Sequence, residues 1–400
     1  MTRKWKLFLG AWLVLGLGLA WGVPRVDAAA AAPTPTATAT APQPAQEVVL
    51  CFPGVYPAGY ASDCMPWGPA EKLSRLAAVG YWYPPEPVPG KPLDLAQWFT
   101  LPGDWHYAWV RDDGSRNMYP SLEDAVKGTH KRHLRKGFVY VSYSQAAYYQ
   151  HKLFYLVKDE GWWMNAQDLW AIEPSKFRGV RLTQTPARPF GWLIKPAVTK
   201  RTPGFAVSDY THHRLERYER IQVYATAQAN GIDWYLIAPD EWVPQTSVGL
   251  VFPKTQPPEG VTGHRWIEVN LFEQTLAVYE QNQLIFATLV STGHAPFWTS
   301  PGVFQIYDKV ETTQMRGAFE ADKSDYYQLD DVPWTMYYDG TRALHGAYWH
   351  DSFGYTTSHG CINLSIADAH WLYVWSRIGD WVYVWDPSGQ TPTDGGGGGP

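Results

Sequence analysis

The last third of the chain places apolar and polar residues in the pattern of a small β domain. Three apolar runs are separated by short polar turns: 266–270, 275–279 and 284–290. Runs of β-branched and aromatic residues bounded by turn residues are typical of strands. Over 366–376 apolar residues recur every three or four positions, which predicts a helix, and Trp381–Trp385 predicts a closing strand. We therefore expect a mostly β domain with one short helix over residues 264–386.

The middle of the chain repeats its own pattern at an interval of about 80 residues. The matching runs are Ala108-Trp109-Val110 with Gly191-Trp192-Leu193, and Tyr155-Leu156-Val157 with Tyr235-Leu236-Ile237. Strand-like stretches follow basic runs in both copies, at Phe138–Ser142 and Ile221–Thr226. Short apolar runs between turn residues predict small all-β modules. We expect two small β-barrel modules, at 105–183 and 184–258, which loosely resemble bacterial Src-homology-type barrels.

These modules have two interpretations. Their aromatic side chains either stack on glycan or other wall polymers, or fill the cores of two modules that are too small to bury much apolar surface otherwise. The second is the more frequent role of a tryptophan in so small a module.

The N-terminal segment has the layout of an export signal. Basic residues precede the apolar stretch Leu7–Trp21, and a small-residue site ends at Ala28, so residues 1–28 predict a secretory signal peptide. An uncleaved segment would instead anchor the chain to the membrane. Residues 29–46 form an Ala/Pro/Thr linker and 387–400 a Gly-rich tail. We expect a secreted chain in the cell envelope, outside the cytoplasmic membrane.

Composition excludes several classes of protein. The chain has 400 residues, of which 45% are hydrophobic and 16% aromatic, and this is too apolar for a disordered chain. The formal net charge is −5, and removal of the signal peptide lowers it to about −8. Nucleic-acid binding needs clustered positive charge, so we expect no nucleic-acid partner.

Three cysteines are present. Cys51 and Cys64 lie in a Gly/Pro-rich segment, 47–104, where they predict a disulfide in an oxidising compartment; the alternative is a pair of unbonded loop thiols. Cys361 is left unpaired. An odd cysteine in an exported protein requires an explanation.

The surroundings of Cys361 favour nucleophilic chemistry. His345, His350 and His359 lie within 16 positions of it, and an imidazole near a thiol promotes formation of the reactive thiolate. Gly360 lets the backbone approach a substrate closely and leaves amide groups for an oxyanion. The alternatives are a zinc site, a buried inert cysteine and a redox thiol. A second closely spaced cysteine is missing, which weighs against zinc and redox chemistry, so we expect no metal and no cofactor.

The run from His345-Gly346 to Ser358-His359-Gly360-Cys361 resembles the signature of the L,D-transpeptidase family with a YkuD-type catalytic domain. The segments around Gly293, Gly302 and Pro333 agree with it. The resemblance covers about 264–386 and implies a C-terminal β-sandwich of that family. It implies nothing about residues 29–255.

The resemblance also implies roles for single residues. Cys361 would be the nucleophile, and His345, oriented by the Gly346 carbonyl, would accept and donate the proton. The amides of Gly360 and Cys361 would form the oxyanion hole. Other residues would shape the site or contact substrate: His359, Ser358, Tyr338, Trp334 and Asn363. Asn363 departs from the pattern, because many members carry arginine there. His350 and Asp351 are interpreted as structural.

These roles predict a peptidoglycan L,D-transpeptidase that cross-links stem peptides through a cysteine thioester. Water as the acceptor would make the same site an L,D-carboxypeptidase. A hypothesis from another class is a wall-binding scaffold whose catalytic domain is idle; the intact pair of His345 and Cys361 weighs against it.

Overall fold

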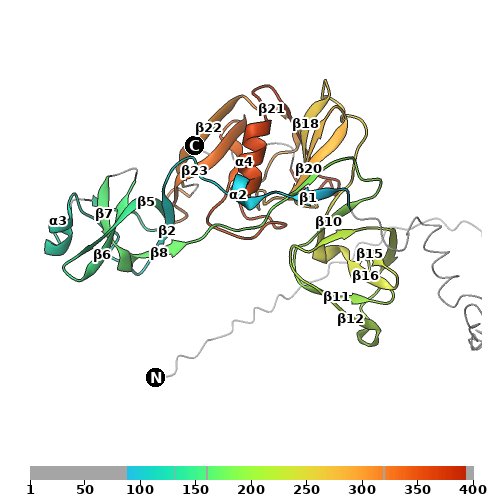
Figure 1. Ribbon diagram of the computed structural model, residues 1–400, viewed down its shortest axis with the longest axis horizontal. Coiled ribbons are helices and arrows are strands. Elements are labelled where there is room, and N and C mark those ends of the chain that lie inside the picture. Colours follow the sequence, from blue (N-terminus) through green and yellow to red (C-terminus); the bar gives the residue numbers. More distant parts are fainter. Residues whose placement is uncertain (1–87, 131, 159–160, 319, 393–400) are drawn as a thin grey trace, which may run out of the picture. The chain divides into compact units, whose positions relative to one another are not determined.

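The computed structural model describes residues 88–130, 132–158, 161–318 and 320–392, which lie within one compact unit (Figure 1). The predicted signal peptide, the linker and the predicted Cys51–Cys64 disulfide lie outside these residues. No helix of the described ranges is long and apolar enough to cross a membrane. The described chain is mostly β with few helices, as expected.

A seven-stranded sheet contains the first strands predicted for the C-terminal domain. Its order is β1 (Gly90–Pro92), β9 (Val180–Leu182), β20 (Gln283–Leu289), β19 (Thr275–Glu280), β18 (Arg265–Asn270), β26 (Trp381–Trp385) and β21 (Gly302–Gln305). Consecutive strands β18, β19 and β20 pair antiparallel through the two predicted turns, whereas β26 returns from the chain end to pair parallel with β18.

A nine-stranded sheet carries the segment around Cys361. Its path is β25 (Ile362–Leu364), β24 (Arg342–Gly346), β23 (Tyr327–Asp339), β5 (Phe138–Tyr149), β2 (His106–Val110) and β8 (Leu169–Ile172). Three strands lie off this path: β22 (Asp308–Gly317) on β23, β6 (Lys152–Val157) on β5, and β7 (Trp162–Asn165) on β6. The first module therefore joins the C-terminal domain by a parallel pairing of β5 with β23.

The largest apolar core lies between these two sheets. Ile267 and Leu276 from the first sheet are buried in one cluster with Met336 and Leu344 from the second. Helix α4 (Ile366–Trp375) adds Leu372 to this cluster and packs against β23 and β24, beside the short helix α2 (Leu95–Trp98) (Figure 1). Burial of this apolar surface holds β24 and β25, and thereby the site, in place.

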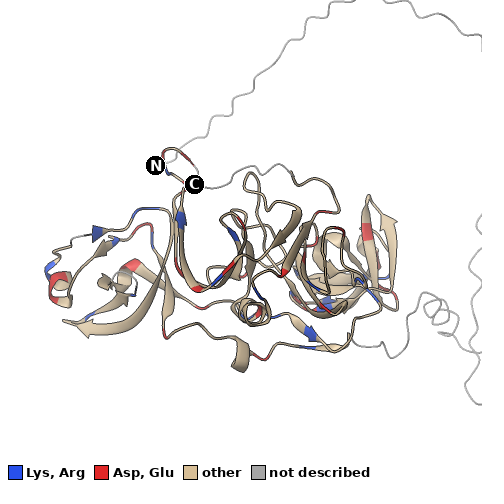
Figure 2. Cartoon of the chain, turned by 90° about the horizontal axis from the view of Figure 1, so that it is seen from above, with Lys and Arg blue, Asp and Glu red and all other residues tan. Residues whose placement is uncertain are grey.

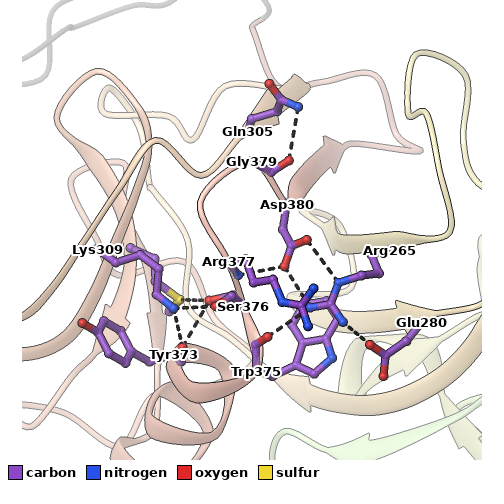
Figure 3. Close-up of polar contacts among 11 residues, drawn as sticks. Arg265, Glu280, Gln305, Lys309, Tyr373, Trp375, Ser376, Arg377, Gly379 and Asp380 are labelled. Atoms are coloured by element: carbon purple, nitrogen blue, oxygen red, sulfur yellow. Dashed lines mark hydrogen bonds and ion pairs between the residues drawn. The ribbon is translucent and has the colours of Figure 1, made fainter.

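Both ends of α4 are capped. The Ser365 hydroxyl accepts a hydrogen bond from the Asp368 N–H at 3.2 Å, which satisfies one of the free amides of the first turn. At the other end Lys309 Nζ donates to the carbonyls of Tyr373 and Ser376 at 2.5 Å each (Figure 3). Cations at a helix C-terminus are stabilising because the last carbonyls carry partial negative charge.

Arg265 connects the same end of α4 to the sheet. Its guanidinium donates to the Trp375 carbonyl and to Asp380, each at 3.0 Å, and pairs with Glu280 (Figure 3). It also lies 4.0 Å from the centre of the Trp375 ring. The contacts of Arg265 therefore join the end of α4 to β18 and to the loop before β26 (Figure 3).

The second module consists of two open sheets. One has the order β13 (Arg220–Gln222), β10 (Phe190–Leu193) and β17 (Val248–Val251); the other has β12 (Tyr210–Leu215), β11 (Ala197–Lys200), β16 (Glu241–Pro244), β15 (Ile232–Ala238) and β14 (Ala225–Ala229). The antiparallel pairs β10–β17 and β15–β16 repeat the pairs β2–β8 and β6–β7 of the first module. No sheet of the described residues closes into a barrel, so the expected barrels are open sheets.

The stretch Ile221–Thr226, expected as one strand, is divided between β13 and β14 in different sheets. Its centre, Val223-Tyr224, leaves the strand conformation, and both side chains are buried in separate clusters. The remaining elements are helix α3 (Leu122–Lys127) and the pair β3 (Asn117–Met118) and β4 (Arg132–His133).

Charges of both signs are interspersed along the described chain (Figure 2). Several buried or half-buried charges have a partner of opposite sign, such as Arg265 with Asp380 and Lys254 with Glu268. Others bond to backbone carbonyls instead, such as Lys200 and Lys309.

Candidate active site

Cys361 and His345 lie on neighbouring parallel strands. Residue 345 of β24 is in register with residue 363 of β25, and Cys361 precedes Asn363 by two positions. Because side chains alternate between the faces of a sheet, the register places His345, Asn363 and Cys361 on one face. All three line a single cavity of about 870 Å³. The structure thus brings the predicted nucleophile and the predicted proton acceptor into one cleft.

The His345 ring is buried and its tautomer is defined. Its Nδ1 lies 3.3 Å from the Gly346 carbonyl oxygen, which can only accept, so Nδ1 carries the hydrogen and Nε2 is the basic nitrogen. Burial, with a smaller effect from nearby His350, lowers the pKa of His345 to about 4, although the hydrogen bond to Gly346 opposes this shift. The imidazole is therefore neutral at pH 7 and able to take a proton.

The Cys361 thiol is a neutral partner at rest. Burial raises its pKa above the ordinary value, and two groups oppose this: the Ala343 amide, which hydrogen bonds to the thiol, and the Arg342 guanidinium. A neutral thiol beside a neutral imidazole means that the proton moves when the sulfur attacks. The raised pKa of Cys361 and the lowered pKa of His345 both disfavour a preformed thiolate–imidazolium pair.

The backbone conformation at position 360 requires glycine. Its φ is +114°, and a Cβ there would lie 2.9 Å from Arg342 Nε. The Gly360 N–H is already bonded to Ser358 Oγ at 3.1 Å, and that hydroxyl donates to the Cys361 carbonyl at 2.6 Å. Of the two amides expected to form the oxyanion hole, only that of Cys361 has no acceptor among the described residues.

Thr299 completes the support of the Gly360 turn. It accepts from the Gly293 N–H at 2.9 Å and donates to the Gly360 carbonyl at 2.8 Å. The segments expected to match the family around Gly293 and Thr299 therefore hold the loop that carries the cysteine.

Asn363 presents a donor to the cleft. The Ser352 N–H donates to His350 Nδ1 at 3.1 Å, so His350 Nε2 carries the ring hydrogen and needs an acceptor. The Asn363 amide lies 3.0 Å from this Nε2 and must offer its oxygen. The Asn363 NH₂ then occupies the other amide position, which is buried and has no partner. His350, interpreted as structural from sequence, thus orients a residue of the cleft.

Two expected substrate contacts are corrected. Tyr338 is 3% exposed in the core and Trp334 is 7% exposed, with its ring stacked 4.1 Å from that of His370; neither lines the cavity. The reason is their position along β23. Side chains alternate between the faces of the strand, so Trp334 and Tyr338 share the core face with Met336, whereas Tyr337 and Asp339 lie on the opposite face and line the cleft.

Sequence reasoning missed Arg342 and Tyr327. Tyr327 stacks on His359 with ring centres 5.3 Å apart, and burial, together with the nearby thiol, raises its pKa to about 12. His359 lines the cleft and its pKa is lowered by burial and by His294. No short sequence motif signals Tyr327 or Arg342, because each reaches Cys361 from another strand.

The rest of the cleft is formed by the β22–β23 hairpin and by the first module. Met315 and Arg316 contribute from β22, and Gly137 and Phe138 from the start of β5. Within the described residues, no three His, Cys, Asp or Glu side chains gather in the arrangement of a metal site.

Comparison with known proteins agrees with this site. Residues 264–384 match the family model YkuD, the L,D-transpeptidase catalytic domain. The C-terminal part of the chain is therefore a catalytic domain of the L,D-transpeptidase family. This family consists typically of cysteine enzymes that act on peptidoglycan stem peptides of the cell wall. No curated protein matches the chain.

Solved structures of the same family are similar in part. An L,D-transpeptidase from Stackebrandtia nassauensis is 28% identical over 33% of this chain and 59% of its own, with a TM-score of 0.26. The catalytic domain of the E. faecium enzyme is 26% identical over 32% of this chain and 100% of its own, with a TM-score of 0.28. An L,D-transpeptidase from Mycobacterium smegmatis is 21% identical over 54% and 93%, with a TM-score of 0.29. The matched region thus spans less than two thirds of the Stackebrandtia chain.

Arg342 offers a test of the electrostatics of the thiol. Its positive charge lowers the Cys361 pKa, so Arg342→Gln is expected to slow alkylation of Cys361 by iodoacetamide at pH 7 by roughly fivefold. The alkylation rate is followed by peptide mass spectrometry as a function of pH. Arg316→Gln is the matched control, because Arg316 lines the same cleft without acting on the thiol pKa. Equal rates for both variants would contradict the assignment.

Proposed function

We propose that the chain is an exported peptidoglycan L,D-transpeptidase that forms cross-links between stem peptides through a thioester on Cys361. The observation that carries this proposal is that Cys361 and His345, whose Nε2 is the basic nitrogen, line one cleft of a YkuD-type domain. The predicted signal peptide supports a place of action in the cell envelope.

In the first half-reaction, the Cys361 sulfur attacks the carbonyl of the amide that joins the diamino acid of a tetrapeptide stem to its terminal D-alanine. His345 Nε2 takes the thiol proton and passes it to the departing amine of D-alanine. We expect the Cys361 N–H, which has no acceptor among the described residues, to stabilise the oxyanion. The products are a thioester on Cys361 and free D-alanine.

In the second half-reaction, the side-chain amine of another stem attacks the thioester. His345 takes a proton from this amine and returns it to the sulfur. The new amide joins the third residues of two stems, and the thiol is restored. Water in place of the amine releases a tripeptide, which is the carboxypeptidase reaction of the same site.

The test is product analysis with disaccharide tetrapeptides as substrate. Liquid chromatography with mass spectrometry is expected to find dimers linked between their third residues, together with free D-alanine. Tripeptide as the sole product would replace the proposal with a carboxypeptidase. No turnover above that of the Cys361→Ala chain would reject both activities.

A further inference from the structure

A second cavity, of about 800 Å³, lies next to the cleft, and residues outside the matched family region form most of it. The segment after β8 contributes Lys176 and Arg178, and the second module contributes Trp192, Tyr218 and Arg220. Trp349 and His350 line this cavity and the catalytic cleft alike. The two spaces therefore share a wall made of two side chains. A volume of this size suits a ligand as large as a short peptide.

The guanidinium of Arg220 has no partner in the described part of the chain. Arg220 is half-buried on β13, directly opposite Trp192 on β10, so both side chains lie on the same face of the sheet. Burial lowers its pKa without compensation from any neighbouring acid. A charge removed from water without a counter-ion is unfavourable. An anionic group bound in the cavity would supply that missing partner.

The other charges of the cavity have partners. Asp351 pairs with Arg217 at 3.5 Å, and its backbone carbonyl accepts from the Tyr218 hydroxyl at 2.7 Å. Arg178 donates to the Leu93 carbonyl at 2.8 Å, and Lys176 lies 3.7 Å from the exposed Glu173. The contacts of Arg217 and Tyr218 with Asp351 fasten the second module to the loop that carries His350. The wall between the cavities is thereby held in position.

We propose that this cavity binds a peptidoglycan stem peptide, with Arg220 pairing to one of its carboxylates. The proposal rests on the proposed function and assigns a second stem-binding site beside the cleft. A stem peptide carries carboxylates and an amine, which fits a cavity that offers both an unpaired cation and the acids Glu173 and Asp351. A phosphodiester polymer carries no amine that could contact the acids Glu173 and Asp351. The half-buried ring of Trp349 provides apolar contact for the peptide backbone.

The test measures binding by isothermal titration to the full chain. The ligand is a stem tripeptide, which lacks the terminal D-alanine and so cannot be cleaved, offered either with free carboxylates or with the same carboxylates amidated. The wild-type chain is expected to bind the free acid roughly tenfold more tightly, as a charge-assisted hydrogen bond provides. In Arg220→Gln the ratio of the two dissociation constants, amidated tripeptide over free acid, is expected to fall to about one.

Arg214→Gln is the matched control, because Arg214 lies exposed in the same module, pairs with Glu216 and does not line the cavity. Its preference for the acid should remain as in the wild type. No acid preference in the wild type, or an unchanged preference in Arg220→Gln, would overturn the proposal. Tighter binding of polyglycerol phosphate than of the tripeptide would also overturn it.

Turnover of disaccharide tetrapeptides separates this proposal from the proposed function. If the wild-type chain turns over substrate but shows no preference for the free-acid tripeptide, the transpeptidase proposal stands and the second binding site is rejected. If the wild-type chain shows no turnover but prefers the free-acid tripeptide, and Arg220→Gln loses this preference, the stem-binding site stands and the transpeptidase proposal is rejected.

Discussion

Replacement of Cys361 by alanine is expected to abolish covalent labelling of the chain by a carbapenem. The strained β-lactam amide acylates a nucleophilic sulfur, and Cys361 is the cysteine that lines the cleft with His345. Intact-protein mass spectrometry should detect one adduct on the wild-type chain and none on Cys361→Ala. This is a complete loss, since alanine offers no nucleophile.

The remaining cysteines provide the control. A chain with both Cys51→Ala and Cys64→Ala retains Cys361 and should keep the single adduct. An adduct of the same mass on Cys361→Ala would show that another group reacts, and the nucleophile would have to be reassigned.

His345→Gln is expected to slow acylation of Cys361 by roughly a thousandfold, the usual range for loss of a general base. Glutamine can still donate to the Gly346 carbonyl, but it cannot take the thiol proton. His264→Gln is the matched control, because His264 is exposed in the same domain and contacts Asn282 at 3.2 Å. Stopped-flow or quenched-flow acylation with a carbapenem measures both variants.

The pH profile distinguishes loss of a base from a structural effect. His345 has a pKa of about 4 in the folded chain, so the imidazole is protonated and unable to accept a proton only below about pH 4. Wild-type acylation should therefore fall with acidification near pH 4 and not near 6.5. His345→Gln should lack this acid limb. A wild-type limb near 6.5, or an unchanged limb in the variant, would contradict the role given to His345.

The link between the cleft and the second module follows from contacts that are far apart in sequence. Tyr218 and Arg217 hold Asp351, and the adjacent His350 orients Asn363 two positions after the nucleophile. The N-terminal modules thus take part in forming the site and are more than spacers.

Local sequence was sufficient to predict several elements and to propose a nucleophile. The strand Trp381–Trp385 and the start of the helix at Ile366 were predicted as observed, because alternation, periodicity and the Ser365 cap act over a few residues. Cys361, Gly360 and His345 are proposed for the site in the same way, since the glycine turn and the motif spacing are properties of one short stretch of chain.

Only the tertiary structure decided which side chains face the cleft. Tyr338 and Trp334 face the core because they alternate with the cleft-facing Tyr337 and Asp339 along β23, and only the packing of the two sheets decides which face of this strand is the core face. Arg342, Tyr327 and Arg220 gain their positions from packing between strands that are distant in sequence. The burial that lowers the pKa of His345 and raises that of Cys361 likewise exists only once both sheets enclose the site, because desolvation is a property of the folded surroundings and not of the residue.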